Sequence, residues 1–178
     1  MNQDQSQQRK KDARTSGEYE QIWQNTGKCV FCDLKDKYIL LEENEVVLTI
    51  NLYPYADGQL MAIPRQHLKS PKELSSQQWE TIRKFSYIAK KIIKKVHQCN
   101  GMWTLIREGG ADAQMSVSDH LHVQFIPFAD PNLCNWNYQE LKNTPLENID
   151  LYKKQSAYIK KLLKRYQDKY KKVEKTDE

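Results

Sequence analysis

The chain has 178 residues, which is room for one domain with a tail. A content of 39% hydrophobic and 29% charged residues, with six glycines and six prolines, excludes a collagen-like or low-complexity protein. No stretch approaches the roughly 18 apolar residues of a membrane span, so we expect no helical membrane protein and no membrane partner. The polar N-terminus lacks the apolar core of a secretory signal. We therefore expect a cytoplasmic protein whose four cysteines are reduced thiols or metal ligands.

The net charge of +5 is concentrated at the C-terminus. Residues 151–178 contain ten basic and four acidic residues, a net charge of +6, and the rest of the chain carries −1. Such a segment is typical of a solvated helix face, and also of a surface that binds nucleic acid. The solvated helix is the simpler interpretation, and nucleic acid stays open as a partner.

The first half of the chain predicts a tail, a short helix and three strands. These are a disordered tail over 1–17, a helix over 18–28 that ends near Gly27, and strands over 38–41, 45–50 and 60–64. The first two strands read as a hairpin joined by Glu42–Asn44, and Pro64 ends the third.

A long amphipathic helix follows. Ser75-Ser76-Gln77-Gln78 has the chemistry of a capping box, and Asn100-Gly101 ends the helix about 20 residues later. Its predicted apolar stripe, at steps of three and four residues, consists of Trp79, Ile82, Ser86, Ala89, Ile93 and Val96.

The second half predicts two more strands, over 102–106 and 120–126, separated by a loop of small residues over 108–118. A second helix covers roughly 149–172. The order of elements indicates an α+β fold, a sheet packed on one face by helices. The predicted organisation is a domain over 18–148 and a basic C-terminal helix and tail over 149–178.

The most informative segment is the run from Asp119 to Ile126. Because a strand alternates its faces, His120, His122 and Gln124 share one face, and Leu121, Val123 and Phe125 share the other. Imidazole and amide groups without partners cost on the order of 1–3 kcal/mol each when buried. The polar face therefore indicates a cleft that holds a ligand, a metal or water, although His-x-His alone also fits a solvent-facing edge strand.

A second signal is the CxxC run of Cys29 and Cys32. A thioredoxin-like redox site fits poorly, because no strand precedes the pair and no helix opens at Cys29. A structural zinc needs four nitrogen or sulfur ligands, which His67 and His120 would complete. The alternative is that both cysteines are simply buried thiols. His97 lies off the apolar stripe of the long helix and is expected to face solvent.

If His120 binds zinc, His122 is free to react. A neutral imidazole is a good nucleophile near neutral pH, and covalent catalysis divides one displacement into two easier steps. The preceding loop offers Gly109, Gly110, Ser116 and backbone N–H groups to phosphate oxygens. A plain surface connection is the alternative for this loop.

Taken together, these motifs resemble the histidine-triad superfamily of nucleotide hydrolases and transferases. The resemblance runs from Cys29 to Pro127 through CVFC, NLYPYADGQLMAIPRQHL and DHLHVQFIP. The YPY run, the Asp-His-Leu-His entry and Asn135-Trp136 look most like the branch of small diadenosine tetraphosphate phosphorylases. The resemblance implies a five-stranded antiparallel sheet with a long helix, and commonly a homodimer.

The resemblance also implies roles for individual residues. His122 matches the nucleophile that forms a nucleotidyl-phosphoramidate, with Gln124 and Ser116 beside it as catalytic residues. His120, Cys29, Cys32 and His67 match the ligands of a structural zinc. The implied nucleotide-binding residues are Asn51, Leu52, Gly110, Ser116 and Gln124.

The sequence departs from the family pattern in three places. Gln124 replaces the third histidine, Gln59 replaces a histidine that often follows the glycine, and the 108–118 loop lacks the usual Ala-Gly-Gln-Ser run. An amide donates a hydrogen bond but delivers no proton. A glutamine at this position resembles the transferases and phosphorylases of the superfamily rather than its hydrolases. The resemblance therefore implies phosphate or a sugar phosphate, rather than water, as the acceptor.

We expect a nucleotidyl transferase or phosphorylase that acts on nucleoside polyphosphates through a covalent nucleotidyl-histidine. The alternatives are a hydrolase of the same substrates, a nucleotide- or nucleic-acid-binding module without turnover, and a zinc-stabilised interaction protein.

Overall fold

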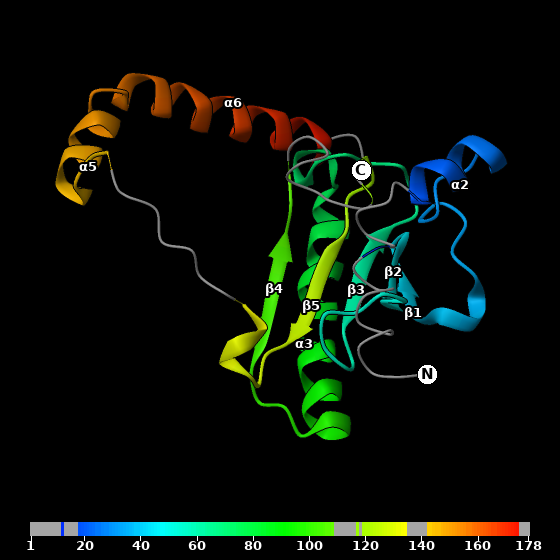
Figure 1. Cartoon of the computed structure of the whole chain (residues 1–178). Helices are drawn as coiled ribbons and strands as arrows, with labels where there is room; N and C mark the ends of the chain where they lie inside the picture. The colour runs from blue at the N-terminus through cyan, green and yellow to red at the C-terminus, as the bar shows by residue number, and fades with distance from the viewer. Residues whose placement is uncertain (1–11, 13–17, 109–116, 118, 135–141, 175–178) are drawn as a thin grey trace. The chain divides into compact units, whose positions relative to one another are not determined.

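A computed structural model describes residues 12, 18–108, 117, 119–134 and 142–174 of the chain. The chain divides into two compact units, Met1–Cys134 and Asn135–Glu178. The first unit contains a five-stranded antiparallel sheet in the order β1-β2-β3-β5-β4 (Figure 1). Its helices and strands are α2 (Glu18–Thr26), β1 (Ile39–Glu43), β2 (Val46–Ile50), β3 (Leu60–Pro64), α3 (Ser76–His97), β4 (Met102–Ile106) and β5 (Val123–Pro127). The predicted α+β class and five-stranded sheet are confirmed.

The turn between β1 and β2 starts two residues later and ends one residue later than predicted. Its two connecting residues are Asn44 and Glu45, with φ angles of 49° and 58°, rather than Glu42–Asn44. Positive φ at both positions is the geometry of a type I′ turn, whose twist matches that of the strands. The tighter turn lets Glu42 and Glu43 stay in the ladder, where they pair with Val47 and Val46.

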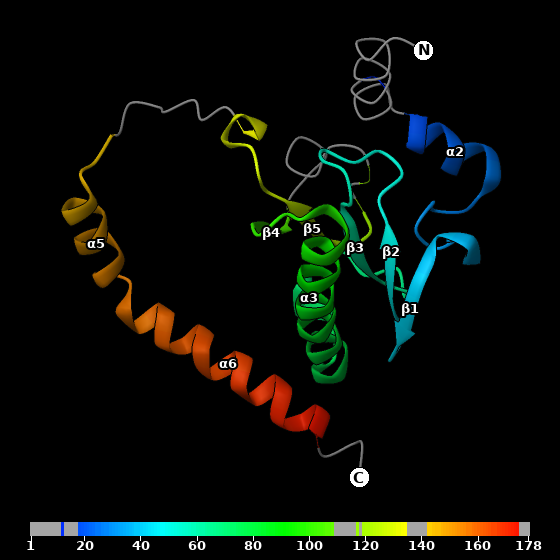
Figure 2. The same ribbon diagram turned by 90° about the horizontal axis from the view of Figure 1, so that it is seen from below.

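Helix α3 lies along one face of the sheet (Figure 2) and contacts β2, β3 and β5. The predicted capping box is confirmed: the Ser75 hydroxyl accepts from the Gln78 backbone, and the Gln78 side chain accepts from the Ser75 backbone. The helix ends at His97, and Gln98 adopts the left-handed conformation, so the stop comes before Asn100-Gly101.

The predicted apolar stripe of α3 is wrong at its two ends. Trp79 and Val96 are exposed, whereas Phe85, which the prediction omitted, is among the largest fully buried side chains. The buried face runs through Gln78, Thr81, Ile82, Phe85, Ala89 and Ile93. Trp79 and Val96 lie beside this face rather than on it, so the helix is rotated slightly from the predicted orientation.

The hydrophobic core lies between α3 and one face of the sheet. Leu60, Ala62, Val123 and Phe125 belong to it, together with Leu121 just before β5. In the register of β3 and β5, Met61 lies opposite Gln124 and therefore on the other face. The predicted separation of Leu121, Val123 and Phe125 from His120, His122 and Gln124 is thus confirmed.

Strand β5 is shorter at its start than the predicted 120–126. The ladder with β3 begins at Val123, because the backbone N–H of Leu121 instead donates to the Leu68 carbonyl at 2.6 Å. Pro127 remains in the ladder as its last residue, opposite Met102.

The second unit contains two helices, α5 (Pro145–Lys153) and α6 (Ser156–Glu174), where the sequence analysis expected one over 149–172. The first begins earlier because Thr144 and Glu147 form a capping box, with Pro145 at the first helical position. Large hydrophobic side chains of these two helices are exposed, among them Leu151, Tyr158, Ile159, Leu162, Leu163 and Tyr166. Among the helices that the structure describes, none is long and apolar enough to cross a membrane.

Candidate functional site

Two cysteines and two histidines converge beside β3 and β5. One donor atom from each of Cys29, Cys32, His67 and His120 lies within 4.8 Å of all the others. The Nδ1 atom of His120 is 3.5 Å from both sulfurs, and the Nδ1 atom of His67 is 3.3 Å from the Cys32 sulfur. The structure thus brings together the four residues that the sequence analysis named as ligands.

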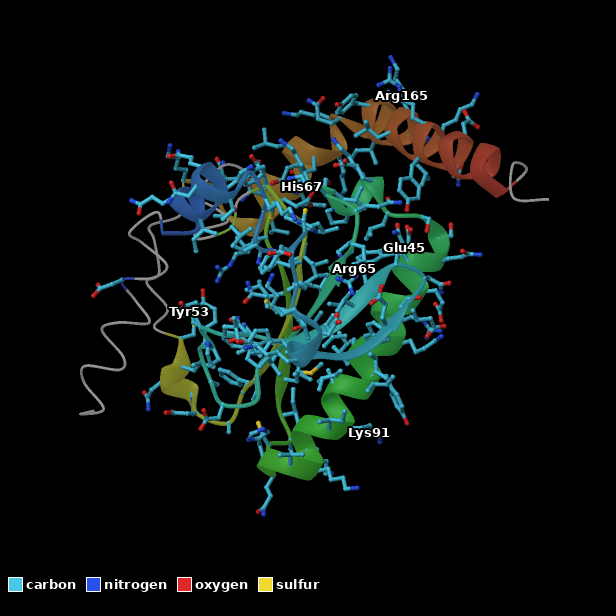
Figure 3. All side chains as sticks on the ribbon, turned by 90° about the vertical axis from the view of Figure 1, so that its right-hand side faces the viewer. Glu45, Tyr53, Arg65, His67, Lys91 and Arg165 are labelled. Atoms are coloured by element: carbon cyan, nitrogen blue, oxygen red, sulfur yellow. The ribbon has the colours of Figure 1, made fainter. Side chains whose placement is uncertain are left out.

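The backbone fixes which nitrogen His120 presents to this cluster. Its Nε2 donates to the Pro64 carbonyl at 2.8 Å, so Nδ1 keeps its lone pair and faces the cysteines. A ring nitrogen bonded to a backbone carbonyl orients a histidine ligand and fixes its tautomer. His67, labelled in Figure 3, follows the end of β3, and its ring packs at a steep angle against those of Trp23 and His120.

The donor set fits a tetrahedral cation. With bonds of about 2.3 Å to sulfur and 2.0 Å to nitrogen, a tetrahedral ion places a neighbouring sulfur and nitrogen about 3.5 Å apart. The three sulfur–nitrogen distances of 3.3 to 3.5 Å are close to this spacing. Partial desolvation and the adjacent Cys29 raise the pKa of the Cys32 thiol to about 11, which a bound cation would reverse. Burial lowers the pKa of His120 to about 4 and keeps it neutral, as a ligand must be.

A pocket opens on the same face of the sheet, next to this Cys–His cluster. Its walls are mostly apolar and aromatic, with a few polar groups from Thr49, Asn51, Arg107, His122 and Gln124. The remaining lining residues are Val30, Phe31, Leu34, Tyr38, Ile50, Leu52, Tyr53, Tyr55, Met61 and Val117. An apolar pocket with a few convergent polar groups is typical of a small-molecule site.

His122 is held with one nitrogen bonded to the backbone and the other directed at Gln124. Its Nδ1 donates to the His120 carbonyl at 2.9 Å, so Nε2 keeps the lone pair. The Gln124 amide nitrogen lies 3.2 Å from Nε2. Burial lowers the pKa of His122, and the nearby charge of Arg107 adds to the effect. The neutral imidazole that results is the form that acts as a nucleophile or base.

Gln124 is itself held by Gln59, which comes directly before β3. Gln59 Nε2 donates to Gln124 Oε1 at 3.0 Å, and Gln59 Oε1 accepts from the Tyr55 backbone N–H at 2.7 Å. Gln59 is 2% exposed and Gln124 5% exposed, so these bonds are shielded from water. The loop that carries Tyr55 also carries Tyr53, labelled in Figure 3.

Arg107 places a positive charge in the pocket wall. It follows the last residue of β4, and its Nη2 donates to the Tyr55 hydroxyl at 3.0 Å. Among the described residues it forms no ion pair.

The other predicted site residues divide into two groups. Asn51 and Leu52 lie in the pocket wall, and Asn51 Oδ1 accepts from the Tyr53 backbone at 2.9 Å. Gly109, Gly110 and Ser116 lie outside the described residues. His97 is exposed, as expected, and packs against Gly58 of the loop between β2 and β3.

The sequence alone did not predict the roles of two residues in this site, Gln59 and Arg107. Gln59 was recognisable as a departure from the family pattern, but its bond to Gln124 depends on how β3 and β5 pair. Arg107 belongs to none of the motifs in the sequence. A basic residue at the junction of a strand and a glycine-containing loop was the available signal, because such loops commonly bind anions.

Residues 28–140 match the protein family described as "Scavenger mRNA decapping enzyme C-term binding". The matched segment contains both the Cys–His cluster and His122, and it covers more than half of the chain. The chain belongs to this family and to the histidine-triad superfamily. The chain is also 30% identical over 82 residues to an AP-4-A phosphorylase of Mycobacterium tuberculosis, a match that covers 46% of this chain and 42% of that protein.

Solved structures support the fold. A histidine-triad family protein from Bacillus anthracis is similar at a TM-score of 0.60 and 20% identity, over 74% of this chain and 96% of that one. A zinc-bound histidine-triad protein from Mycobacterium smegmatis is similar at a TM-score of 0.51 and 15% identity, over 66% of this chain and 85% of that one. At these identities the likeness describes the fold of this chain and not its ligands.

Proposed function

We propose that the chain is a nucleotidyl transferase that works through a covalent nucleotidyl-His122 intermediate. The observation that carries this proposal is the His122 ring: Nδ1 is bonded to the His120 carbonyl, while Nε2 keeps its lone pair beside the pocket. A nucleophile needs this arrangement, because the ring is both neutral and fixed in direction. The match to the AP-4-A phosphorylase supports a nucleoside polyphosphate as substrate.

In the first step, Nε2 of His122 forms a bond to the α-phosphorus of the substrate, and the bond to the bridging oxygen breaks. The polyphosphate leaves with the electron pair of that bond. The Gln124 amide, which touches Nε2 in the free protein, then donates to a phosphoryl oxygen. In the second step an acceptor oxygen takes the nucleotidyl group, and His122 returns to its neutral form.

We propose inorganic phosphate as the acceptor, which makes the protein a phosphorylase. The side chain two residues after His122 is an amide, Gln124, which cannot deliver or remove a proton. Phosphate is itself an anionic nucleophile at neutral pH and needs less help from a base than water does. Hydrolysis of the same substrates is the second candidate, and it differs in the acceptor alone.

We further propose that the Cys–His cluster holds a structural zinc ion. Its ligands would be Cys29, Cys32, His67 and His120, a closed set that leaves no position for substrate. The zinc would tie the CxxC segment to the residues just before β5 and so fix the His120 carbonyl that orients His122.

The deciding experiment is product analysis on diadenosine tetraphosphate with and without inorganic phosphate. We expect ADP and ATP, formed when phosphate is present. AMP and ATP, formed regardless of phosphate, would instead identify a hydrolase. No turnover together with no trapped adduct would reject the catalytic proposal and favour a binding module.

A trapping experiment tests the nucleophile itself. Wild-type protein, mixed with labelled substrate and quenched in alkali, should retain label on His122, since phosphoramidates survive base. His122→Ala should retain none. An exposed histidine, His97, provides the matched control His97→Ala, which should trap label as the wild type does. Label that persists in His122→Ala would overturn the assignment.

A further inference from the structure

A line of hydrogen bonds runs through the buried side of the site, and both of its ends are fixed by the backbone. At one end the Tyr55 backbone N–H can only donate, and Gln59 Oε1 accepts it at 2.7 Å. The amide nitrogen of Gln59 must therefore point the other way. It lies 3.0 Å from Gln124 Oε1, which accepts its hydrogen.

At the other end the His120 carbonyl can only accept. His122 Nδ1 lies 2.9 Å from it and must carry the proton, so Nε2 is an acceptor. The Gln124 amide nitrogen lies 3.2 Å from Nε2 and donates to it. Every donor along the line therefore points in the same direction, from Tyr55 toward His120. The hydrogen-bond partners therefore determine which end of each glutamine amide is the oxygen and which is the nitrogen.

We propose that Gln59 is a positioning residue, whose bond to Gln124 Oε1 keeps the Gln124 amide nitrogen on His122 Nε2 and so holds the reactive lone pair in place. The inference rests on the proposed function in one respect, the role of Nε2 as nucleophile. Gln59 does not line the pocket, so its effect passes through Gln124.

Burial makes this bond matter. Gln124 Oε1 lies inside the protein, where a carbonyl oxygen without a donor is costly. If Gln59 gives no donor, the Gln124 oxygen must find one by admitting water or by moving away from its place beside the ring. The amide nitrogen then no longer stays on Nε2, and the ring and the amide no longer hold one arrangement.

The line also defines which side chains can replace Gln59. The position needs an acceptor toward Tyr55 and a donor toward Gln124. A neutral imidazole has one acceptor and one donor, so it can accept from Tyr55 and donate to Gln124 as Gln59 does. An ionised carboxylate has acceptors alone, and a thioether gives no donor. Histidine should therefore preserve the line at position 59, whereas glutamate and methionine should break it.

The test compares the wild type with Gln59→Met, Gln59→His and Gln59→Glu. Gln77→Met, on the exposed first turn of α3, is the matched control. The rate of label transfer from diadenosine tetraphosphate to His122 should fall about tenfold in Gln59→Met and Gln59→Glu, with KM changed less than about twofold. Gln59→His should recover to within about threefold of wild type. Equal rates in all variants, or an increase in KM with an unchanged rate of label transfer, would overturn the inference.

A second readout needs no substrate. In 15N-labelled protein without nucleotide, the ring nitrogens of His122 should report one tautomer, protonated at Nδ1, in wild type, Gln59→His and Gln77→Met. Gln59→Met should show shifted or averaged ring signals. An unchanged His122 spectrum in Gln59→Met would sink the proposal even if catalysis were lost.

The two readouts also keep the proposals apart. If wild type transfers no label while the His122 signals change in Gln59→Met, the catalytic proposal fails and the positioning role stands. If Gln59→Met does not fold, Gln59→His against Gln59→Glu decides, because only the first restores a donor.

Discussion

At the scale of single residues, the site depends on bonds to backbone groups whose direction cannot change. The carbonyls of Pro64 and His120 each accept from one histidine nitrogen, and in doing so they assign opposite tasks to the two rings. His120 turns Nδ1 toward the cysteines, whereas His122 turns Nε2 toward the pocket. Two histidines of the short segment that leads into β5 thus acquire different chemistry from the backbone alone.

Arg107 should discriminate ligands by charge. Its guanidinium lies in the pocket wall with His122, so Arg107→Met should weaken binding of ATP about tenfold while leaving adenosine within twofold. Arg107→Lys should retain part of the affinity, because it keeps the charge but not the planar fork. Titration calorimetry with both ligands measures this.

Arg83→Met is the control for the Arg107 variants, because Arg83 is exposed on α3 and pairs with Glu80. It should bind both ligands as the wild type does. An equal loss of ATP and adenosine in Arg107→Met would show that the arginine supports the pocket wall rather than the phosphate.

Cys29 should carry part of the stability through the proposed zinc. Its sulfur is buried and lies 3.5 Å from His120 Nδ1. A ligand present at 1,000 times its Kd stabilises the folded state by about 4 kcal/mol, so Cys29→Ser should lose much of that amount together with the metal. Metal analysis should find about one zinc per wild-type chain and little in the variant.

Cys99→Ser is the control that separates the loss of zinc-dependent stability from the effect of replacing any buried thiol. Cys99 is also buried, but its sulfur bonds to the Gly101 carbonyl, away from the Cys–His cluster. It should keep the zinc and respond to a chelator as the wild type does. A Cys29→Ser protein that holds a full equivalent of zinc would contradict the proposed ligand set.

At the scale of elements, the hairpin of β1 and β2 has a residue in a strained backbone conformation at its turn. Glu45 holds a φ angle of 58°, which costs a residue with a side chain roughly 1 kcal/mol. Glu45→Gly should raise the free energy of unfolding by about 0.5–1 kcal/mol, since glycine favours this turn position. Urea denaturation with an unchanged m-value would measure it.

Asn44→Gly is the instructive comparison for this turn. Asn44 has a positive φ too, but its side-chain nitrogen donates to Thr81 Oγ1 on α3 at 2.9 Å. Removing that bond should make Asn44→Gly less stable than wild type. A destabilised Glu45→Gly would mean that the exposed bond of Glu45 to Gln66 outweighs the backbone strain.

The elements also show which features the sequence could predict. Strands 60–64 and 102–106 were predictable to the residue, because Pro64 and Gly101 bound short apolar runs. The face that His122 and Gln124 share followed from strand alternation. The turn at Asn44 and Glu45 was misplaced because Glu45 is an unusual residue at positive φ. The bond between Gln59 and Gln124 needs the register of two strands far apart in sequence, which no local pattern contains.

At the scale of the whole molecule, the chemistry proposed here belongs to one of the two compact units. The described residues of the Cys–His cluster and of the pocket all lie in Met1–Cys134. The unit Asn135–Glu178 contains α5 and α6 and most of the net positive charge. The two units therefore differ in composition as well as in structure.

A chain that ends at residue 140 tests this division. It keeps the segment that matches the family, residues 28–140, and loses α5 and α6. We expect it to fold, to bind about one zinc ion and to label His122 at a rate within about threefold of the full chain. Such a result would place the complete catalytic apparatus in the first unit. If the truncated chain folds and binds zinc but no longer labels His122, then the second unit contributes to the site.

The same pair of chains tests the basic segment as a nucleic-acid surface. If the segment binds nucleic acid, the full chain should bind single-stranded RNA with a salt-dependent affinity that the truncated chain lacks, because Lys and Arg contacts to phosphates release counterions. Equal, salt-independent binding by both chains would leave the basic helix as a solvated surface.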